Sequence, residues 1–108
     1  MNSYRNWAAI FLLGVLAFGT VCLGQTETQS TYVSKCQPCH GPTGAGDTPM
    51  GKKLGVVPYS SEDVVKSSDA SLLAILKYGK DKMPPFEHKL TDDQRKALIV
   101  YIRTLTGK

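Results

Sequence analysis

A five-residue motif in the first half of the chain constrains its fold more than any other feature. It reads Cys36-Gln37-Pro38-Cys39-His40, and this C-x-x-C-H spacing is the pattern at which haem c is attached to proteins. Two thiols at this spacing can each form a thioether to one vinyl group of the same porphyrin. The adjacent histidine can then supply a ring nitrogen to the iron. We therefore expect Cys36 and Cys39 to hold one haem c covalently, with His40 as an axial iron ligand.

Three other interpretations of the two cysteines remain. A thioredoxin-type redox site needs a preceding strand and a βαβ context, and no strand pattern lies upstream of Cys36. A structural zinc site needs four nitrogen or sulfur ligands, whereas only His88 follows the motif as a further ligand of this kind. A plain disulfide would fit an oxidising compartment. The motif favours haem c over these three.

The second axial iron ligand has three candidates downstream of the motif. Met83 precedes Pro84 and Pro85, which prevent helix and hold the methionine on a stiff loop. Met50 follows His40 so closely that the chain would struggle to reach the opposite face of the haem. His88 lies between two charged residues, and we expect it to be exposed to solvent. The pattern favours Met83 as the second iron ligand.

The N-terminal residues have the pattern of a secretory signal. A polar start containing Arg5 is followed by an apolar run over residues 7–23 and then by an abrupt change to polar residues. We expect residues 1–24 to be a signal peptide cut after Gly24, which would place the protein in the bacterial periplasm or on the outer face of the cytoplasmic membrane. The rival is an uncleaved anchor, although the run is short against the roughly 17–25 residues that span a bilayer. A lipidated Cys22 would be another tether.

The remaining residues, 25–108, have the length of one domain. The 108-residue chain is 42% hydrophobic and 20% charged, which is typical of a globular protein rather than a disordered one. A domain this small buries only a thin core and often depends on a disulfide, a metal or a cofactor for stability. We expect the haem to have that role.

The spacing of apolar residues and the positions of glycine, proline and capping residues predict helices and loops but no strand of useful length. A first helix should run from about residue 27 or 28 into the motif. The glycine- and proline-rich stretch 41–60 should be an irregular loop. A short helix is expected at 61–67, capped by Ser60 or Ser61. Asp69 should cap a further helix that ends at Gly79.

The last helix has the clearest signals. Thr91-Asp92-Asp93-Gln94 is a capping box with acidic residues in the first turn. The expected apolar stripe consists of Leu98, Tyr101, Ile102 and Leu105, and the side chains expected to face water are Arg95, Lys96 and Arg103.

Taken in order, these segments resemble the class I cytochromes c, the small single-haem electron carriers with His/Met ligation. The C-x-x-C-H motif with its following glycines, the Lys82-Met83-Pro84 loop and the aromatic-bearing helix near residues 97–103 carry this resemblance. It covers nearly all of residues 28–105 and is greatest to the short bacterial carriers. It implies an all-α, cytochrome c-like fold: three to four helices and irregular loops wrapped around one covalently bound haem.

The resemblance also implies two supporting residues. In the family a backbone carbonyl, often from a proline after the haem motif, fixes the ring of the proximal histidine. Pro58 is our candidate for this contact with His40, and Pro42 and Pro49 remain as alternatives. Leu98 is expected to pack on the haem, and Tyr101 on the first helix.

The expected function is one-electron transfer between exported or membrane-bound redox partners, not enzymatic catalysis. An iron with all six positions filled has no place for a substrate, and a thioether ligand stabilises Fe(II). If Met83 does not bind iron, a haem peroxidase or gas sensor is the alternative. An uncleaved or lipidated N-terminus would instead give a membrane-tethered electron-transfer subunit.

Lysines around the two predicted ligand segments indicate the kind of partner. They are Lys77, Lys80, Lys82 and Lys89 near the methionine, and Lys35, Lys52 and Lys53 near the motif. Lysines around an exposed haem edge would steer the protein to acidic docking surfaces, and we expect these on membrane oxidase, reductase or dehydrogenase complexes. Nucleic acid is not an expected partner, because the lysines are not interleaved with stacking aromatics. We expect a monomer.

Overall fold

The computed structural model describes residues 22–106, and over these residues the protein is all-α. The helices are α1 (Cys22–Lys35), α2 (Gln37–His40), α3 (Pro49–Leu54), α4 (Glu62–Lys66), α5 (Asp69–Tyr78) and α6 (Asp92–Thr106). The described part contains no strand, only an isolated bridge between Lys80 and Met83. The all-α fold is therefore confirmed, with more and shorter helices than the three to four expected.

The predicted signal peptide lies outside the described residues, except for residues 22–24, which belong to α1. The described part of this helix begins at Cys22, ahead of the start expected at residue 27 or 28. Within residues 22–106, no helix is both long enough and apolar enough to cross a membrane.

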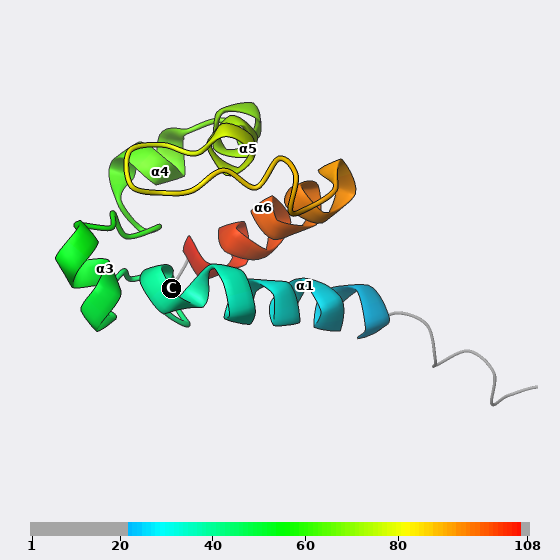
Figure 1. Cartoon of the computed structure of the whole chain (residues 1–108), viewed down its shortest axis with the longest axis horizontal. Coiled ribbons are helices and arrows are strands. Elements are labelled where there is room, and N and C mark those ends of the chain that lie inside the picture. Colours follow the sequence, from blue (N-terminus) through cyan, green and yellow to red (C-terminus); the bar gives the residue numbers. More distant parts are fainter. Residues whose placement is uncertain (1–21, 107–108) are drawn as a thin grey trace, which may run out of the picture.

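Helix α6 is the centre of the fold, because it packs against α1 on one side and α5 on the other (Figure 1). The crossing of α1 and α6 buries Tyr32 and Leu98 almost completely. The rings of Tyr32 and Tyr101 lie 5.0 Å apart between the same two helices, so Tyr101 packs on the first helix as predicted. Ile99 and Ile102 extend this core toward α5.

The predicted start of α6 is confirmed in detail. Thr91 Oγ1 accepts a hydrogen bond from the Gln94 backbone N–H at 3.1 Å, and Gln94 Oε1 accepts one from the Thr91 N–H at 2.8 Å. This reciprocal pair satisfies two backbone donors that a helix start otherwise leaves free. Asp92 and Asp93 occupy the first turn, where their charge complements the helix dipole.

The caps of α4 and α5 follow the sequence prediction with one correction. Ser61 caps α4 by accepting a hydrogen bond from the Val64 N–H. Ser68, rather than the predicted Asp69, caps α5. Asp69 is the first residue of that helix, and its carboxylate is instead bound by Arg103 of α6 at 3.1 Å.

Helix α3 forms within the stretch that was predicted to be irregular. Its start is favourable, because the Thr48 side chain accepts from the Gly51 N–H and a proline takes the first helical position. Gly51 is required by packing rather than by its dihedral angles. A Cβ atom at Gly51 would lie 2.3 Å from the carbonyl oxygen of Cys39, so α3 crosses the haem motif at backbone contact.

The prediction that Arg95 faces water is wrong, and Arg103 is only partly exposed. Arg95 is only 4% exposed, and its Nη1 donates to the carbonyl oxygens of Phe86 at 3.0 Å, Glu87 at 3.1 Å and Leu90. Its Nη2 pairs with Asp92. Arg95 therefore ties the turn at residues 86–90 to the start of α6.

Arg103 makes a similar connection near the other end of α6. In addition to its ion pair with Asp69, its guanidinium donates to the carbonyl oxygens of Val64 and Ser67. Arg103 therefore joins α6 to the end of α4 and the start of α5.

We expect Arg95→Ala to lower the free energy of unfolding by about 2–4 kcal/mol, because several carbonyl groups of the 86–90 turn lose their donor. Urea unfolding of the haem-loaded protein measures this change. Lys96→Ala, an exposed neighbour on the same helix, should stay within about 0.5 kcal/mol of the parent. Equal losses in the two variants would contradict the role given to Arg95.

Candidate functional site

A cavity of about 490 Å³ opens between the haem motif, α5, α6 and the loop that follows α5. This volume lies in the usual range of small-molecule and cofactor sites. Most of its lining is apolar. The apolar and aromatic side chains that line it are Leu54, Val56, Val57, Tyr59, Val64, Leu72, Ile75, Leu76, Phe86, Ile99 and Ile102.

Four residues predicted to bind haem or iron line this same cavity. Cys36, Cys39 and His40 reach it from the motif, and Met83 reaches it from the loop after α5. The chain thus brings together side chains that are far apart in sequence. Two thiols, an imidazole and a thioether in an apolar cavity are the donor set that a covalently bound, six-coordinate haem requires. The residues present therefore fit the cofactor.

The motif occupies a backbone that neighbouring side chains hold in place. The Tyr32 hydroxyl donates to the Gly41 carbonyl at 2.7 Å. The Thr48 hydroxyl lies 2.8 Å from the Pro38 carbonyl and 3.1 Å from the Cys39 carbonyl. These bonds satisfy carbonyl groups that a helix as short as α2 leaves without internal partners.

Both cysteines of the motif are free thiols in the structure. Burial, the largest cause, raises the pKa of the Cys36 thiol to about 11. A thiol with so high a pKa is protonated at neutral pH, unlike the low-pKa cysteines of thiol–disulfide enzymes. This environment argues against the thioredoxin-type interpretation of the motif.

His40 presents a neutral imidazole within the site. Burial lowers the pKa of its ring, and the neutral form is the one that ligates metals. The ring stacks on that of Tyr59, with 4.8 Å between centroids and 22° between planes. Its Nδ1 is buried and has no hydrogen-bond partner among the described residues.

The hydrogen bond expected between Pro58 and His40 is not formed here. The Pro58 carbonyl accepts instead from the Ser61 N–H at 3.0 Å, because residues 58–61 form the turn that leads into α4. The assignment of Pro58 as partner of His40 stays a prediction for the haem-bound protein.

Met83 ends a tight turn. The Lys80 N–H donates to the Met83 carbonyl at 3.1 Å, and the Met83 N–H donates to the Lys80 carbonyl at 2.9 Å. The turn lies so close to the end of α5 that a Cβ atom at Gly79 would meet the Met83 carbonyl oxygen at 2.6 Å. Beyond the prolines, the Phe86 N–H donates to the Leu76 carbonyl at 2.9 Å. Both ends of the methionine loop are thus fixed on α5.

The two competitors of Met83 lie elsewhere. Met50 is on α3, is 49% exposed and does not line the cavity. The His88 side chain is 93% exposed, with Glu87 as its neighbour at 4.0 Å. Only Met83, among these three candidates, is placed to act on a group inside the cavity.

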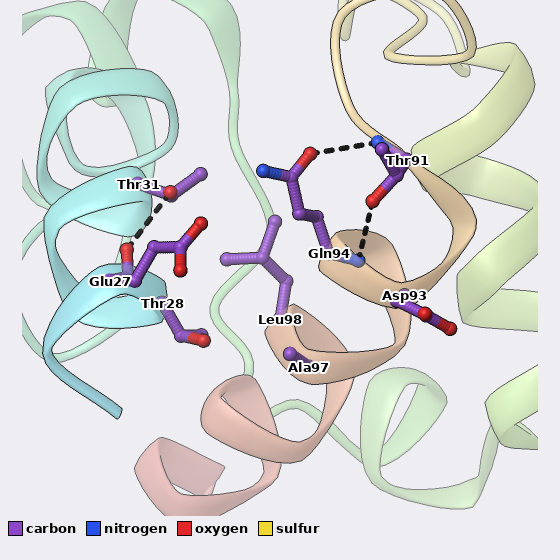
Figure 2. A pocket seen from close by; sticks show the side chains of 8 residues that line it. All are labelled: Glu27, Thr28, Thr31, Thr91, Asp93, Gln94, Ala97 and Leu98. Atoms are coloured by element: carbon purple, nitrogen blue, oxygen red, sulfur yellow. Dashed lines mark hydrogen bonds between the residues drawn. The ribbon is translucent and has the colours of Figure 1, made fainter. Parts of the chain in front are cut away.

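Leu98 does not line this cavity. It is 1% exposed, and Figure 2 shows its side chain pointing from α6 toward α1, in a smaller pocket of about 370 Å³ between those helices. From α6, Ile99 and Ile102 line the larger cavity instead. Their spacing of three places them on one helix face, and the expected stripe contained Ile102 but not Ile99.

Tyr59 also lines the larger cavity, and no sequence motif predicted it.

Comparisons with known proteins agree with this geometry. The family model described as "Cytochrome C oxidase, cbb3-type, subunit III" matches residues 25–102. A solved structure, "KustC0563 c-type cytochrome", is 30% identical with a TM-score of 0.66, and the match covers 72% of this chain and 95% of that one. A search of curated proteins finds no match. The chain therefore belongs to the cytochrome c oxidase, cbb3-type, subunit III family and is a small c-type cytochrome, a haem-based electron carrier.

Proposed function

We propose that the protein carries single electrons between exported or membrane-bound redox partners, with one haem c held by Cys36 and Cys39 and ligated by His40 and Met83. The observation that carries this proposal is the convergence of these four side chains on one apolar cavity. When bound, haem c supplies one-electron exchange between Fe(II) and Fe(III).

The residues of the chain have three tasks in this function. The two thiols of the motif anchor the porphyrin, and the neutral His40 ring offers a nitrogen to the iron. The Met83 thioether favours the reduced iron and so raises the reduction potential. The apolar lining from α5 and α6 keeps water away from the porphyrin, so that the protein rather than the solvent sets the reduction potential of the iron.

Charge around the cavity supports an acidic partner. Of the seven lysines noted in the sequence, Lys35, Lys80 and Lys82 line the cavity. Asp63 and Asp81 also line it, so the region is mixed rather than uniformly basic. Positive groups at an electron-transfer site speed the encounter with an acidic surface. The family description favours a partner within a respiratory oxidase complex.

An exported location fits the same proposal. The family match begins at residue 25, the first residue after the expected cleavage site, which supports a signal peptide over residues 1–24 followed by a cytochrome c domain. Haem c is attached outside the cytoplasm, so export of this domain is a condition for loading it.

The first prediction of this proposed function concerns the methionine ligand. We expect Met83→Ala to keep the haem but to lower its reduction potential by more than about 59 mV, a tenfold change in a one-electron equilibrium, because Fe(II) loses its thioether. Potentiometric titration followed by visible absorption measures this change. Met50→Ala, the matched variant outside the cavity, should leave the potential unchanged.

An unchanged potential in Met83→Ala would refute the assignment of this ligand. High-spin absorption bands in the parent protein would do the same, and they would favour the haem peroxidase or gas sensor.

The second prediction concerns covalent attachment. With the protein exported in cells that carry haem c maturation enzymes, the parent should retain haem on a denaturing gel. Cys36→Ala combined with Cys39→Ala should lose it, because no thioether can form. Cys22→Ala, outside the motif, should still retain it. Haem that stays with the double variant under denaturing conditions would exclude attachment at these two cysteines.

The third prediction concerns docking. Lys82→Glu should slow electron transfer to an acidic redox partner at low ionic strength, and added salt should reduce the difference, because screening weakens the attraction of the parent. Lys96→Glu makes the same change in net charge on α6, away from the cavity lining, and should slow the reaction less. Stopped-flow kinetics over a range of salt concentrations measures both. Equal effects of the two variants would indicate net charge rather than a docking surface.

A further inference from the structure

We propose that Arg95 is a positioning residue for Met83: by holding the turn at residues 86–90, it keeps the methionine on the iron and external ligands off it. The proposal rests on the proposed ligation of iron by Met83. It goes beyond that ligation, because it identifies a side chain outside the cavity that sets how readily the methionine leaves.

The turn that carries Met83 has little of its own to hold it in place. It lies in the loop between α5 and α6 (Figure 1). Lys80, Asp81 and Lys82 are exposed, so buried contacts contribute little to its stability. Asp81 has a φ of 53°, which costs energy for a residue with a side chain. The two bonds between Lys80 and Met83 join the turn to itself. The turn therefore depends on the segments at its two ends.

Two prolines make a stiff connection from Met83 to the next anchored residue. Pro84 and Pro85 have fixed φ angles, and a residue that precedes a proline is restricted to extended backbone. Because neither proline has an N–H, the first backbone donor after Met83 is Phe86, which bonds to the Leu76 carbonyl at 2.9 Å. A movement of Met83 away from the cavity is passed through this short segment to Phe86.

Residues 86 and 87 are held between two helices. Their N–H groups donate to α5, and the Glu87 N–H reaches the Lys77 carbonyl at 3.1 Å. Their carbonyl groups accept from α6, where Arg95 Nη1 lies 3.0 Å from the Phe86 oxygen and 3.1 Å from the Glu87 oxygen. Arg95 is thus the α6 side of this connection.

The contacts of Arg95 are specific to a guanidinium. The residue is 4% exposed, so little water competes for its hydrogen bonds, and bonds from a charged donor are stronger than neutral ones. Nη2 pairs with Asp92 while Nη1 serves the carbonyls of the turn. A lysine has the same charge but lacks the planar fork that reaches both sides. Arg95→Lys therefore weakens the connection without changing the net charge.

A loosened turn has a consequence at the iron. For an external ligand such as imidazole to bind, the Met83 sulfur must leave the iron, and an imidazole nitrogen takes its place with no change in oxidation state. When opening of the loop precedes binding, the rate of exchange follows the population of the open loop. Arg95 lowers that population, because its bonds exist only while residues 86 and 87 stay in place.

The test uses the haem-loaded full chain in the ferric state and follows imidazole binding by stopped-flow absorption. Arg95→Lys should accelerate binding by about tenfold or more, the equivalent of one hydrogen bond to a charged group. Without imidazole it should keep the weak far-red absorption band of a methionine–iron bond, which shows that the site is folded. Parent-like rates in Arg95→Lys would overturn the proposal.

Arg103→Lys is the matched control. Arg103 also binds carbonyl groups from α6, but those of Val64 and Ser67, away from the methionine loop. The control should unfold at a lower urea concentration than the parent and bind imidazole at the parent rate. Equal acceleration by the two lysine variants would indicate a general loss of stability and would overturn the role of Arg95.

Met83→Ala removes the ligand through which Arg95 acts. It should bind imidazole faster than the parent, and adding Arg95→Lys should change the rate no further. An undiminished effect of Arg95→Lys in this background would overturn the proposal. A parent that binds imidazole as fast as Met83→Ala and lacks the far-red band would instead overturn the ligation by Met83, and this proposal with it.

The parent protein supplies a test that does not depend on the folding of any variant. Amide hydrogen exchange compares the ferric parent with and without bound imidazole. The Phe86 and Glu87 amides should exchange faster in the imidazole complex, because departure of Met83 pulls them away from α5, while the Ile99 amide within α6 should stay protected. Unchanged protection of Phe86 and Glu87 in the complex would overturn the connection from Met83 to Arg95.

Discussion

The rest of the structure depends on how the backbone of the haem motif is fixed. A helix of four residues, α2, has almost no internal hydrogen bonds, so its neighbours must hold it. The Tyr32 hydroxyl of α1 donates to the Gly41 carbonyl, directly after α2, and the Thr48 hydroxyl bonds to two carbonyls within α2. Gly51 lets α3 pack directly on the backbone of α2. The irregular residues 41–60 are therefore the support of the motif rather than a simple connection.

The other wall of the site is supported from α6. Arg95 binds carbonyl groups of the 86–90 turn, and Ile99 and Ile102 follow it on the same helix and line the cavity. One helix thus supplies both apolar surface and the anchor of the turn that follows the methionine loop. Most helical stability comes from such tertiary packing rather than from propensity.

Features formed by residues close in sequence could be predicted from the sequence, whereas contacts between residues far apart in sequence could not. The motif, the Met83 loop and the Thr91–Gln94 capping box depend on residues close in sequence. The structure forms the capping box as predicted and brings the motif and Met83 to the same cavity. The burial of Arg95 depends on three carbonyl groups of a preceding turn, and no helical periodicity contains that information. Tyr59 meets His40 only because Gly44 leaves room for it, and so the pair was not visible in the sequence.

The contact between Gly44 and Tyr59 has a consequence for how such a chain can vary during evolution. The ring occupies the volume that any side chain at residue 44 would need, so the two positions share one fixed space. A larger residue at 44 would have to displace this ring, and it would also be strained by the positive φ of 76° at this position. We therefore expect glycine to be retained at residue 44 in related sequences that keep an aromatic ring at residue 59.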